Sequence, residues 1–239
     1  MKRLPAILAS SALLFLISCG SGPAKEDTKA ADTAAAVVAP PAEVKPVFSP
    51  FKVFTVQHKV KNFAKWETVY NGSDSISKGY GLSHYMIGRD IKDSNMVYVI
   101  EKMEDMAKAK TFSTLPDLKA AMKNAGVISQ PGFTYAEIIR SDESPVETSD
   151  RMMVAHHVKD FAAWVKVFDA EGADTRKANG MIDRQLARSL VDSNMIYITF
   201  AVSDMGKAKA RTMSPELKKT MTDAGVDSPP TIRWFKVVN

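Results

Sequence analysis

The chain has 239 residues, a formal net charge of +5 and 25% charged residues. The lysines are scattered among acidic residues without a long basic run, which argues against nucleic-acid binding. Cysteine occurs once, at Cys19, so this composition excludes an intramolecular disulfide, a cysteine metal site and thiolate catalysis in a mature domain.

The first residues are predicted to be a targeting signal, residues 1–18, rather than part of the fold. Lys2 and Arg3 precede an uncharged, largely apolar run of about 14 residues, which is shorter than the roughly 20 residues of a membrane-spanning helix. The run ends in Leu16-Ile17-Ser18-Cys19, which resembles the lipobox of bacterial lipoproteins. The resemblance implies cleavage before Cys19, a diacylglycerol on its sulfur, and a membrane as a partner.

The segment 19–50 is predicted to be a disordered tether. It is rich in Ala, Pro, Lys and Glu and has no aromatic residue before Phe48, so it cannot bury enough apolar surface to fold. Gly20 stands where an Asp would retain an enteric-type lipoprotein at the inner membrane. We therefore expect a lipid-anchored protein of the bacterial cell envelope, at the outer membrane, facing the periplasm or the cell surface.

The remainder of the chain is an internal repeat. HKVKNFAKW at positions 58–66 returns as HHVKDFAAW at 156–164, and 17 of the 35 residues from Asp93 to Val127 are identical to those from Asp192 to Val226. We name residues 51–141 repeat 1 and residues 151–239 repeat 2, with a polar linker, 142–150, between them. So high an identity, at an offset of 98 residues in the first match and 99 in the second, indicates duplication of one structural unit.

Each repeat begins with a predicted strand and a helix. Apolar residues alternate from Phe54 to Val60, which predicts a strand. Asn62, or Asp160 in repeat 2, suits the N-cap of the following helix. An aromatic stripe then follows at helical spacing, and the helical region ends at Gly81 or Gly180. The stripe residues are Phe63, Trp66 and Tyr70 in repeat 1, and Phe161, Trp164 and Phe168 in repeat 2.

The second half of each repeat is predicted to be a hairpin, two helices and a strand. In repeat 1 the hairpin strands are Leu82–Ile91 and Asn95–Met103, joined by a tight turn. A short helix, Met103–Phe112, precedes a second helix that Pro116 opens at a favoured first-turn position. Phe133–Arg140 is the last strand. The order β-α-β-β-α-α-β is a ferredoxin-like unit, so the fold class is α+β.

Such a unit leaves one face of its sheet bare. We expect the two ferredoxin-like repeats to pack sheet to sheet and cover both faces, forming an internal pseudo-dimer in a chain that is otherwise a monomer.

These features resemble the dimeric α/β-barrel superfamily, which includes antibiotic-biosynthesis monooxygenase-like domains. The resemblance rests on the strand-end His-x-Val, the stretch from Asp160 to Asp169 with its three aromatic residues, and the late Ala-Gly-Val. It implies an intramolecular α/β-barrel whose lumen can hold a ligand. Members include cofactor-free oxygenases, haem-degrading enzymes, isomerases, dismutases and binding proteins. Gln57 and Ala155 stand where haem-degrading members carry Asn, so no haem or other cofactor is expected.

Histidines and tyrosines are the candidate catalytic residues. A paired strand histidine can act as a general base or ligand at the barrel mouth, or can simply be satisfied by one hydrogen bond. A paired mid-strand tyrosine can orient a substrate if its face of the sheet is the lumen. No His/Asp/Glu cluster has the spacing of a metal site, so no metal is expected. The candidates are His58, His156, Tyr98 and Tyr197.

Ligand-binding candidates are also paired by the repeat. Each tryptophan either packs in the core or lines the lumen, and each strand arginine either holds an anionic group or is a solvated strand end. The candidates are Trp66, Trp164, Arg89 and Arg188. Glu101 aligns with Phe200, so at most one repeat retains a site.

Three functions remain open at this point. The first is a lipid-anchored protein whose barrel binds a small apolar or aromatic ligand. The second is a cofactor-independent monooxygenase-like enzyme that uses the candidate histidines and tyrosines. The third is a structural or protein-interaction lipoprotein whose lumen is filled by its own side chains.

Overall fold

The structure is a computed structural model, and it describes residues 48–72 and 74–238. The predicted signal peptide, Cys19 and most of the predicted tether lie outside the described residues. The described residues belong to one compact unit. No helix within the described ranges is long and apolar enough to cross a membrane.

The two repeats contain the same series of elements, and the order of these elements differs from the prediction at one place. The first helical region is two helices rather than one, so each repeat runs β-α-α-β-β-α-α-β. In repeat 2 the helical region is interrupted at Gly172, whose φ of 81° is incompatible with an α-helix. The helix predicted over Met103–Phe112 also begins later, at Met106, because Met103 belongs to the preceding strand. The elements of repeat 1 are β1 (Phe51–Lys59), α1 (Phe63–Gly72), α2 (Asp74–Gly79), β2 (Leu82–Asp90), β3 (Met96–Met103), α3 (Met106–Thr114), α4 (Pro116–Asn124) and β4 (Gly132–Ser141).

The first strand of repeat 2 begins at Asp150, the last residue of the predicted linker. The elements of repeat 2 are β5 (Asp150–His157), α5 (Phe161–Glu171), α6 (Ala173–Ala178), β6 (Met181–Ser189), β7 (Met195–Val202), α7 (Met205–Thr212), α8 (Pro215–Asp223) and β8 (Thr231–Val238).

The predicted caps of α1 and α5 are confirmed. Oδ1 of Asn62 accepts a hydrogen bond from the backbone N–H of Lys65 at 2.9 Å, and Oδ1 of Asp160 accepts one from Ala163 at 2.8 Å. Each cap fixes the corner at which a strand turns into the helix that covers it.

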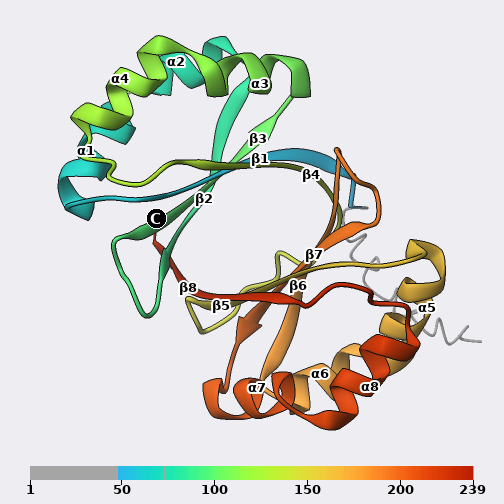
Figure 1. The fold of residues 1–239 in the computed structure, drawn as a ribbon. Helices are drawn as coiled ribbons and strands as arrows, with labels where there is room; N and C mark the ends of the chain where they lie inside the picture. The colour runs from blue at the N-terminus through green and yellow to red at the C-terminus, as the bar shows by residue number, and fades with distance from the viewer. Residues whose placement is uncertain (1–47, 73, 239) are drawn as a thin grey trace, which may run out of the picture. The chain divides into compact units, whose positions relative to one another are not determined.

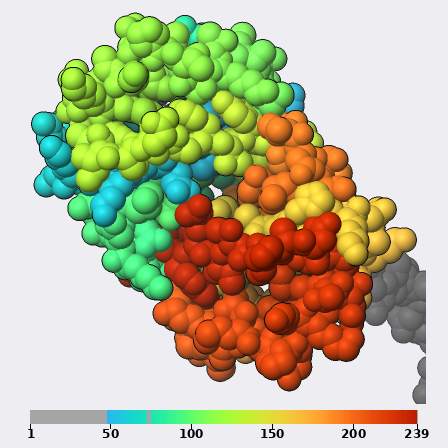
Figure 2. Space-filling view, in the orientation of Figure 1, coloured from blue at the N-terminus to red at the C-terminus, as the bar shows by residue number. Residues whose placement is uncertain are grey.

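The eight strands form one closed antiparallel barrel in the order β1-β3-β2-β8-β5-β7-β6-β4. Each repeat contributes four consecutive strands, and two seams join them. At the first seam β2 pairs with β8, and at the second β4 pairs with β6. The predicted fold class, α+β with two ferredoxin-like repeats in an intramolecular α/β-barrel, is confirmed. Backbone hydrogen bonds, and not only face-to-face packing, join the two sheets, and Figure 2 shows the C-terminal residues, in red, directly against green residues of repeat 1.

Helices cover the outer face of the barrel on both sides (Figure 1). On the outer face of repeat 1, strand residues such as Phe54 and Val99 pack with Trp66 and Phe112 from the helices. A matching cluster forms on the outer face of repeat 2. A third cluster contains strand residues from both repeats and faces the barrel interior: Val53, Ala136, Ile138 and Ala187 are buried, and Phe48, Phe51, Tyr85, Ile100 and Tyr197 pack against them.

Candidate functional site

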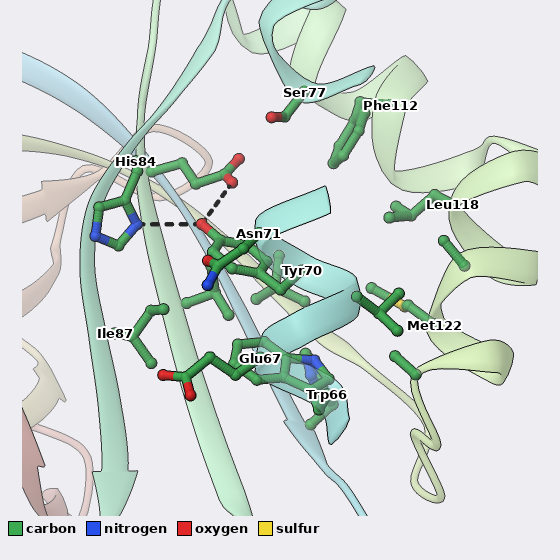
Figure 3. Close-up of a pocket in the computed structure, with 17 residues that line it drawn as sticks. Trp66, Glu67, Tyr70, Asn71, Ser77, His84, Ile87, Phe112, Leu118 and Met122 are labelled. Carbon is green, nitrogen blue, oxygen red and sulfur yellow. Dashed lines mark hydrogen bonds between the residues drawn. The ribbon is translucent and has the colours of Figure 1, made fainter. Parts of the chain in front are cut away.

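A cavity of about 440 Å³ lies between the sheet of repeat 1 and its four helices. It is therefore outside the barrel, on the helix-covered face. Trp66 and Phe112 contribute aromatic walls, and Leu118 and Met122 of α4 close the side opposite the sheet (Figure 3). This size is within the usual range for small-molecule sites, which are mostly apolar with a few convergent polar groups.

A hydrogen-bonded cluster supplies the polar groups of this cavity. The phenol of Tyr70, on α1, donates to Oε1 of Glu101 at 3.2 Å and lies 3.2 Å from Nδ1 of His84 (Figure 3). Glu101 and His84 are cross-strand partners on β3 and β2, so the barrel register sets their proximity. Glu101 is only 5% exposed, whereas His84 is exposed. The cluster thus connects the surface to the interior of the cavity.

His58 lies deeper in the same cavity. Its side chain is 3% exposed, its ring packs 5.6 Å from that of Trp66, and neither ring nitrogen has a hydrogen-bond partner within the described part of the protein. Burial lowers the pKa of His58 to about 4, so the imidazole is neutral at pH 7. A neutral imidazole with two unsatisfied nitrogens can donate one hydrogen bond to a ligand and accept another.

The space in repeat 2 that is equivalent to this cavity has a volume of only about 90 Å³, and a separate hollow of about 210 Å³ borders Arg176 and Asp183 beside it. Arg176, from α6, is 4% exposed and occupies the equivalent space. Its Nε and Nη2 donate to the carboxylate of Asp183 at 2.7 and 2.6 Å, and its guanidinium carbon lies 3.8 Å from the centre of the Phe168 ring. His156 is buried beside Trp164 as His58 is beside Trp66, and burial lowers its pKa to about 4 as well.

Four substitutions between the repeats account for the difference in volume. At the offsets set by the repeat, Tyr70 corresponds to Phe168, His84 to Asp183 and Glu101 to Phe200. The decisive position is Ser77, which corresponds to Arg176, because a serine there leaves open the space that a guanidinium fills. Repeat 1 therefore carries the open site.

The predicted histidines and tryptophans meet in the structure, but not at the barrel lumen. His58 and Trp66 line the cavity of repeat 1, and His156 and Trp164 line its small counterpart. Both histidines point to the outer, helix-covered face of the barrel, which corrects their expected position at the barrel mouth. Both tryptophans are also core residues, since each belongs to the hydrophobic cluster of its repeat.

The predicted tyrosines lie on the other face of the sheet. Tyr197 belongs to the interior cluster, and Tyr98 packs 5.6 Å from Phe235 across the first seam while its phenol donates to Asp90 at 3.2 Å. Burial raises the pKa of both phenols. These tyrosines do not lie beside the histidines, because side chains alternate between the two faces of a sheet. The tyrosines are on the interior face of the barrel and the histidines on the helix-covered face.

Arg89 and Arg188 brace the hairpins. Each Nε donates at 2.8 Å to a backbone carbonyl of the hairpin turn, that of Ser94 or Ser193. Each guanidinium also stacks on the first aromatic residue of the helix, at 3.9 Å in repeat 1 and 4.0 Å in repeat 2. Neither arginine lines the two cavities.

Sequence reasoning missed Tyr70, Ser77 and His84 as site residues. The signal was present in the repeat: positions where the two copies differ in charge or size, such as Ser77 and Arg176, mark the site. In the described ranges, no group of three His, Cys, Asp or Glu side chains is placed to hold a metal ion.

Several solved structures resemble this chain in their fold. A protein from Fusobacterium nucleatum with a provisional monooxygenase name is 12% identical, with a TM-score of 0.51 over 80% of this chain and 93% of that one. An anthrone oxidase-like protein is 11% identical, with a TM-score of 0.53 over 79% of this chain and 92% of that one. The chain shares its fold with these two structures. At these identities the likeness shows the fold alone, and neither a protein-family model nor a curated protein matches the chain.

Proposed function

We propose that this protein binds one small, largely apolar or aromatic molecule in the cavity of repeat 1. The observation that carries the proposal is the contrast between a cavity of about 440 Å³ in repeat 1 and one of about 90 Å³ in repeat 2. Aromatic and aliphatic walls would bury the body of the ligand, and the neutral His58 and the Tyr70 cluster would orient its polar groups.

A pair of matched variants tests this location. Ala121 lines the cavity of repeat 1, and Thr220 is its counterpart in repeat 2. Native mass spectrometry of the chain, purified from its own host, should show one retained small molecule. Ala121→Trp should lose it and Thr220→Trp should keep it. Retention by both variants, or loss from both, would contradict a site in repeat 1.

A cofactor-independent oxygenase is the second candidate function. The hydrogen-bonded connection from the exposed His84 through Tyr70 to the buried Glu101 favours it, because such a connection can move a proton between a bound substrate and solvent. The monooxygenase and oxidase names of the two structural neighbours agree with this candidate. Oxygen consumption upon addition of the retained ligand, reduced at least tenfold by Tyr70→Phe, would establish it. An oxygen concentration that stays constant after the ligand is added would contradict the oxygenase and leave binding as the function.

Anchoring of the chain to a membrane of the bacterial cell envelope through an acylated Cys19 is part of the same proposal. The lipobox-like sequence supports it. Metabolic labelling with a tagged palmitate should mark the chain and place it in the membrane fraction, and Cys19→Ala should abolish both. Label on the Cys19→Ala variant would refute acylation at this residue.

A further inference from the structure

Arg176, which fills the cavity of repeat 2, is bound there as an organic cation would be bound. The guanidinium of Arg176 is held in four ways: by the bidentate carboxylate of Asp183, by the face of Phe168, by the backbone carbonyl of Phe168 at 2.7 Å, and by Glu171 at 3.4 Å. A planar cation between a carboxylate and an aromatic face is a complete recognition site, occupied here by the protein itself.

Repeat 1 keeps the elements of this recognition site without the internal cation. Tyr70 presents an aromatic ring at the position of Phe168. A single carboxylate is again present in the cross-strand pair of the first two hairpin strands, on Glu101 of β3 instead of Asp183 of β6. Ser77 replaces the arginine, and the freed space is part of the cavity.

The lining of the cavity contains two carboxyl groups and two histidines, His58 and His84. Glu67 and Glu101 both line it, and the described residues that line it include no lysine or arginine. His58 stays neutral at pH 7 and adds no positive charge. Such a site disfavours a carboxylate or phosphate ligand and favours a cation, whose charge the buried Glu101 would balance.

We propose that the ligand of repeat 1 is an organic cation, an ammonium or guanidinium group on an aromatic or aliphatic body, which takes the place that Arg176 occupies in repeat 2. Glu101 is its counter-charge, the ring of Tyr70 is its aromatic face, and Trp66, Phe112 and Met122 bury its body. This inference rests on the proposed binding function and adds the chemical class of the ligand.

Isothermal titration of the whole chain, purified in detergent at pH 7, tests the charge preference. The probes are amines paired with alcohols of the same body: phenethylamine with phenethyl alcohol, tryptamine with tryptophol, and octylamine with octanol. At least one amine should bind tenfold or more tightly than its alcohol, at one site per chain. Glu101→Gln should remove that preference, and Glu104→Gln, on an exposed residue after the same strand, should keep it.

The outcomes separate the two proposals. Alcohols that bind as well as their amines would overturn the cation and leave the apolar site of repeat 1 standing. Absence of binding by every probe would overturn the cation proposal, while a molecule retained in native mass spectrometry would still support the binding function. An amine preference that survives Glu101→Gln would overturn the assigned counter-charge.

An exchange of the two key residues provides an independent test. Ser77→Arg should close repeat 1 and reduce the stoichiometry for the best amine from one to zero. Arg176→Ser should open repeat 2, with Asp183 as the carboxylate, and raise the stoichiometry to two. An unchanged stoichiometry in both variants, each shown to be folded by circular dichroism, would overturn the equivalence between Arg176 and the ligand.

Discussion

Single side chains decide the character of the two cavities, and the buried histidines are the clearest case. Both are neutral in the fold, since burial lowers the pKa of each to about 4, while an unfolded chain protonates them near pH 6.5. Between these values the unfolded state holds more protons. The stabilisation is therefore fully present above pH 6.5 and is lost as the pH falls toward 4, by about 3 kcal/mol per histidine.

Urea unfolding at pH 7 and pH 4.5 measures this loss. His58→Phe should remove a large part of the dependence on pH, and the double variant with His156→Phe should remove more. His157→Phe is the control with the opposite sign, because the hydrogen bond to Asp227 raises the pKa of His157 in the fold. That pair stabilises the protein at low pH and loses its effect as the pH rises. An unaltered pH dependence in His58→Phe would contradict a buried neutral imidazole.

Arg176 should contribute far more to the free energy of unfolding than Arg140, a half-exposed arginine that also donates two hydrogen bonds to one carboxylate. Arg176→Met leaves the carboxylate of Asp183 without its buried partner, whereas Glu171 keeps its ion pair with Arg211 at 2.6 Å. We expect a loss of about 3–5 kcal/mol in the free energy of unfolding. Arg140→Met breaks the pair with Asp169, where both side chains are about half exposed, and should cost at most about 1 kcal/mol. Equal losses in urea unfolding would rule out this distinction.

Helices and strands could be predicted where the local sequence pattern was strong. The alternation from Phe54 to Val60 and the caps at Asn62 and Asp160 were sufficient to predict β1, α1 and α5. The break before α2 and α6 could not be predicted, because a six-residue helix is too short to show a period. The sequence also could not predict which face of the sheet carries the site. Alternation assigns strand residues to two faces, but it does not show which face the helices cover.

The turn between α6 and β6 depends on the glycine that the repeat preserves. Gly180 has a φ of 78°, and a Cβ there would lie 2.5 Å from the backbone oxygen of Asp204. Gly172 has a similar φ of 81°, but a Cβ would meet nothing within 4 Å. Gly172 combines its positive φ with a ψ of 146°, a conformation almost restricted to glycine, so Gly172→Ala should cost the conformational strain alone, about 1–3 kcal/mol. Gly180→Ala should cost more, because it adds the clash with Asp204. Thermal unfolding midpoints check the order, and a reversed order would contradict it.

Closure of the barrel is the property of the whole molecule that the sequence predicted in outline. A duplicated unit with one bare sheet face needs a second copy, and the pairing of two copies in one chain followed from that. The edge pairing at the seams could not be read from periodicity, because it depends on how β2 meets β8 and β4 meets β6. The site was partly predictable: the repeat singled out His58 and Trp66 as shared residues, and Ser77 and His84 as positions where the two copies differ. That these four residues line one cavity follows only from the three-dimensional structure.

The two seams should make the repeats unfold together. Trp66 reports on repeat 1, and Trp164 and Trp234 report on repeat 2. In Trp66→Phe, and separately in the double variant Trp164→Phe/Trp234→Phe, the change in tryptophan emission with urea should coincide with the loss of circular dichroism. A variant in which emission changes well before or after the circular dichroism would show that one repeat unfolds alone.

A crystal structure of the chain with its retained ligand tests the central claim most directly. We predict density for one ligand, on the helix-covered face of repeat 1, between Trp66 and Glu101, with the guanidinium of Arg176 still filling the equivalent place in repeat 2. Density inside the barrel beside Tyr98 and Tyr197, or density in both repeats, would contradict the account.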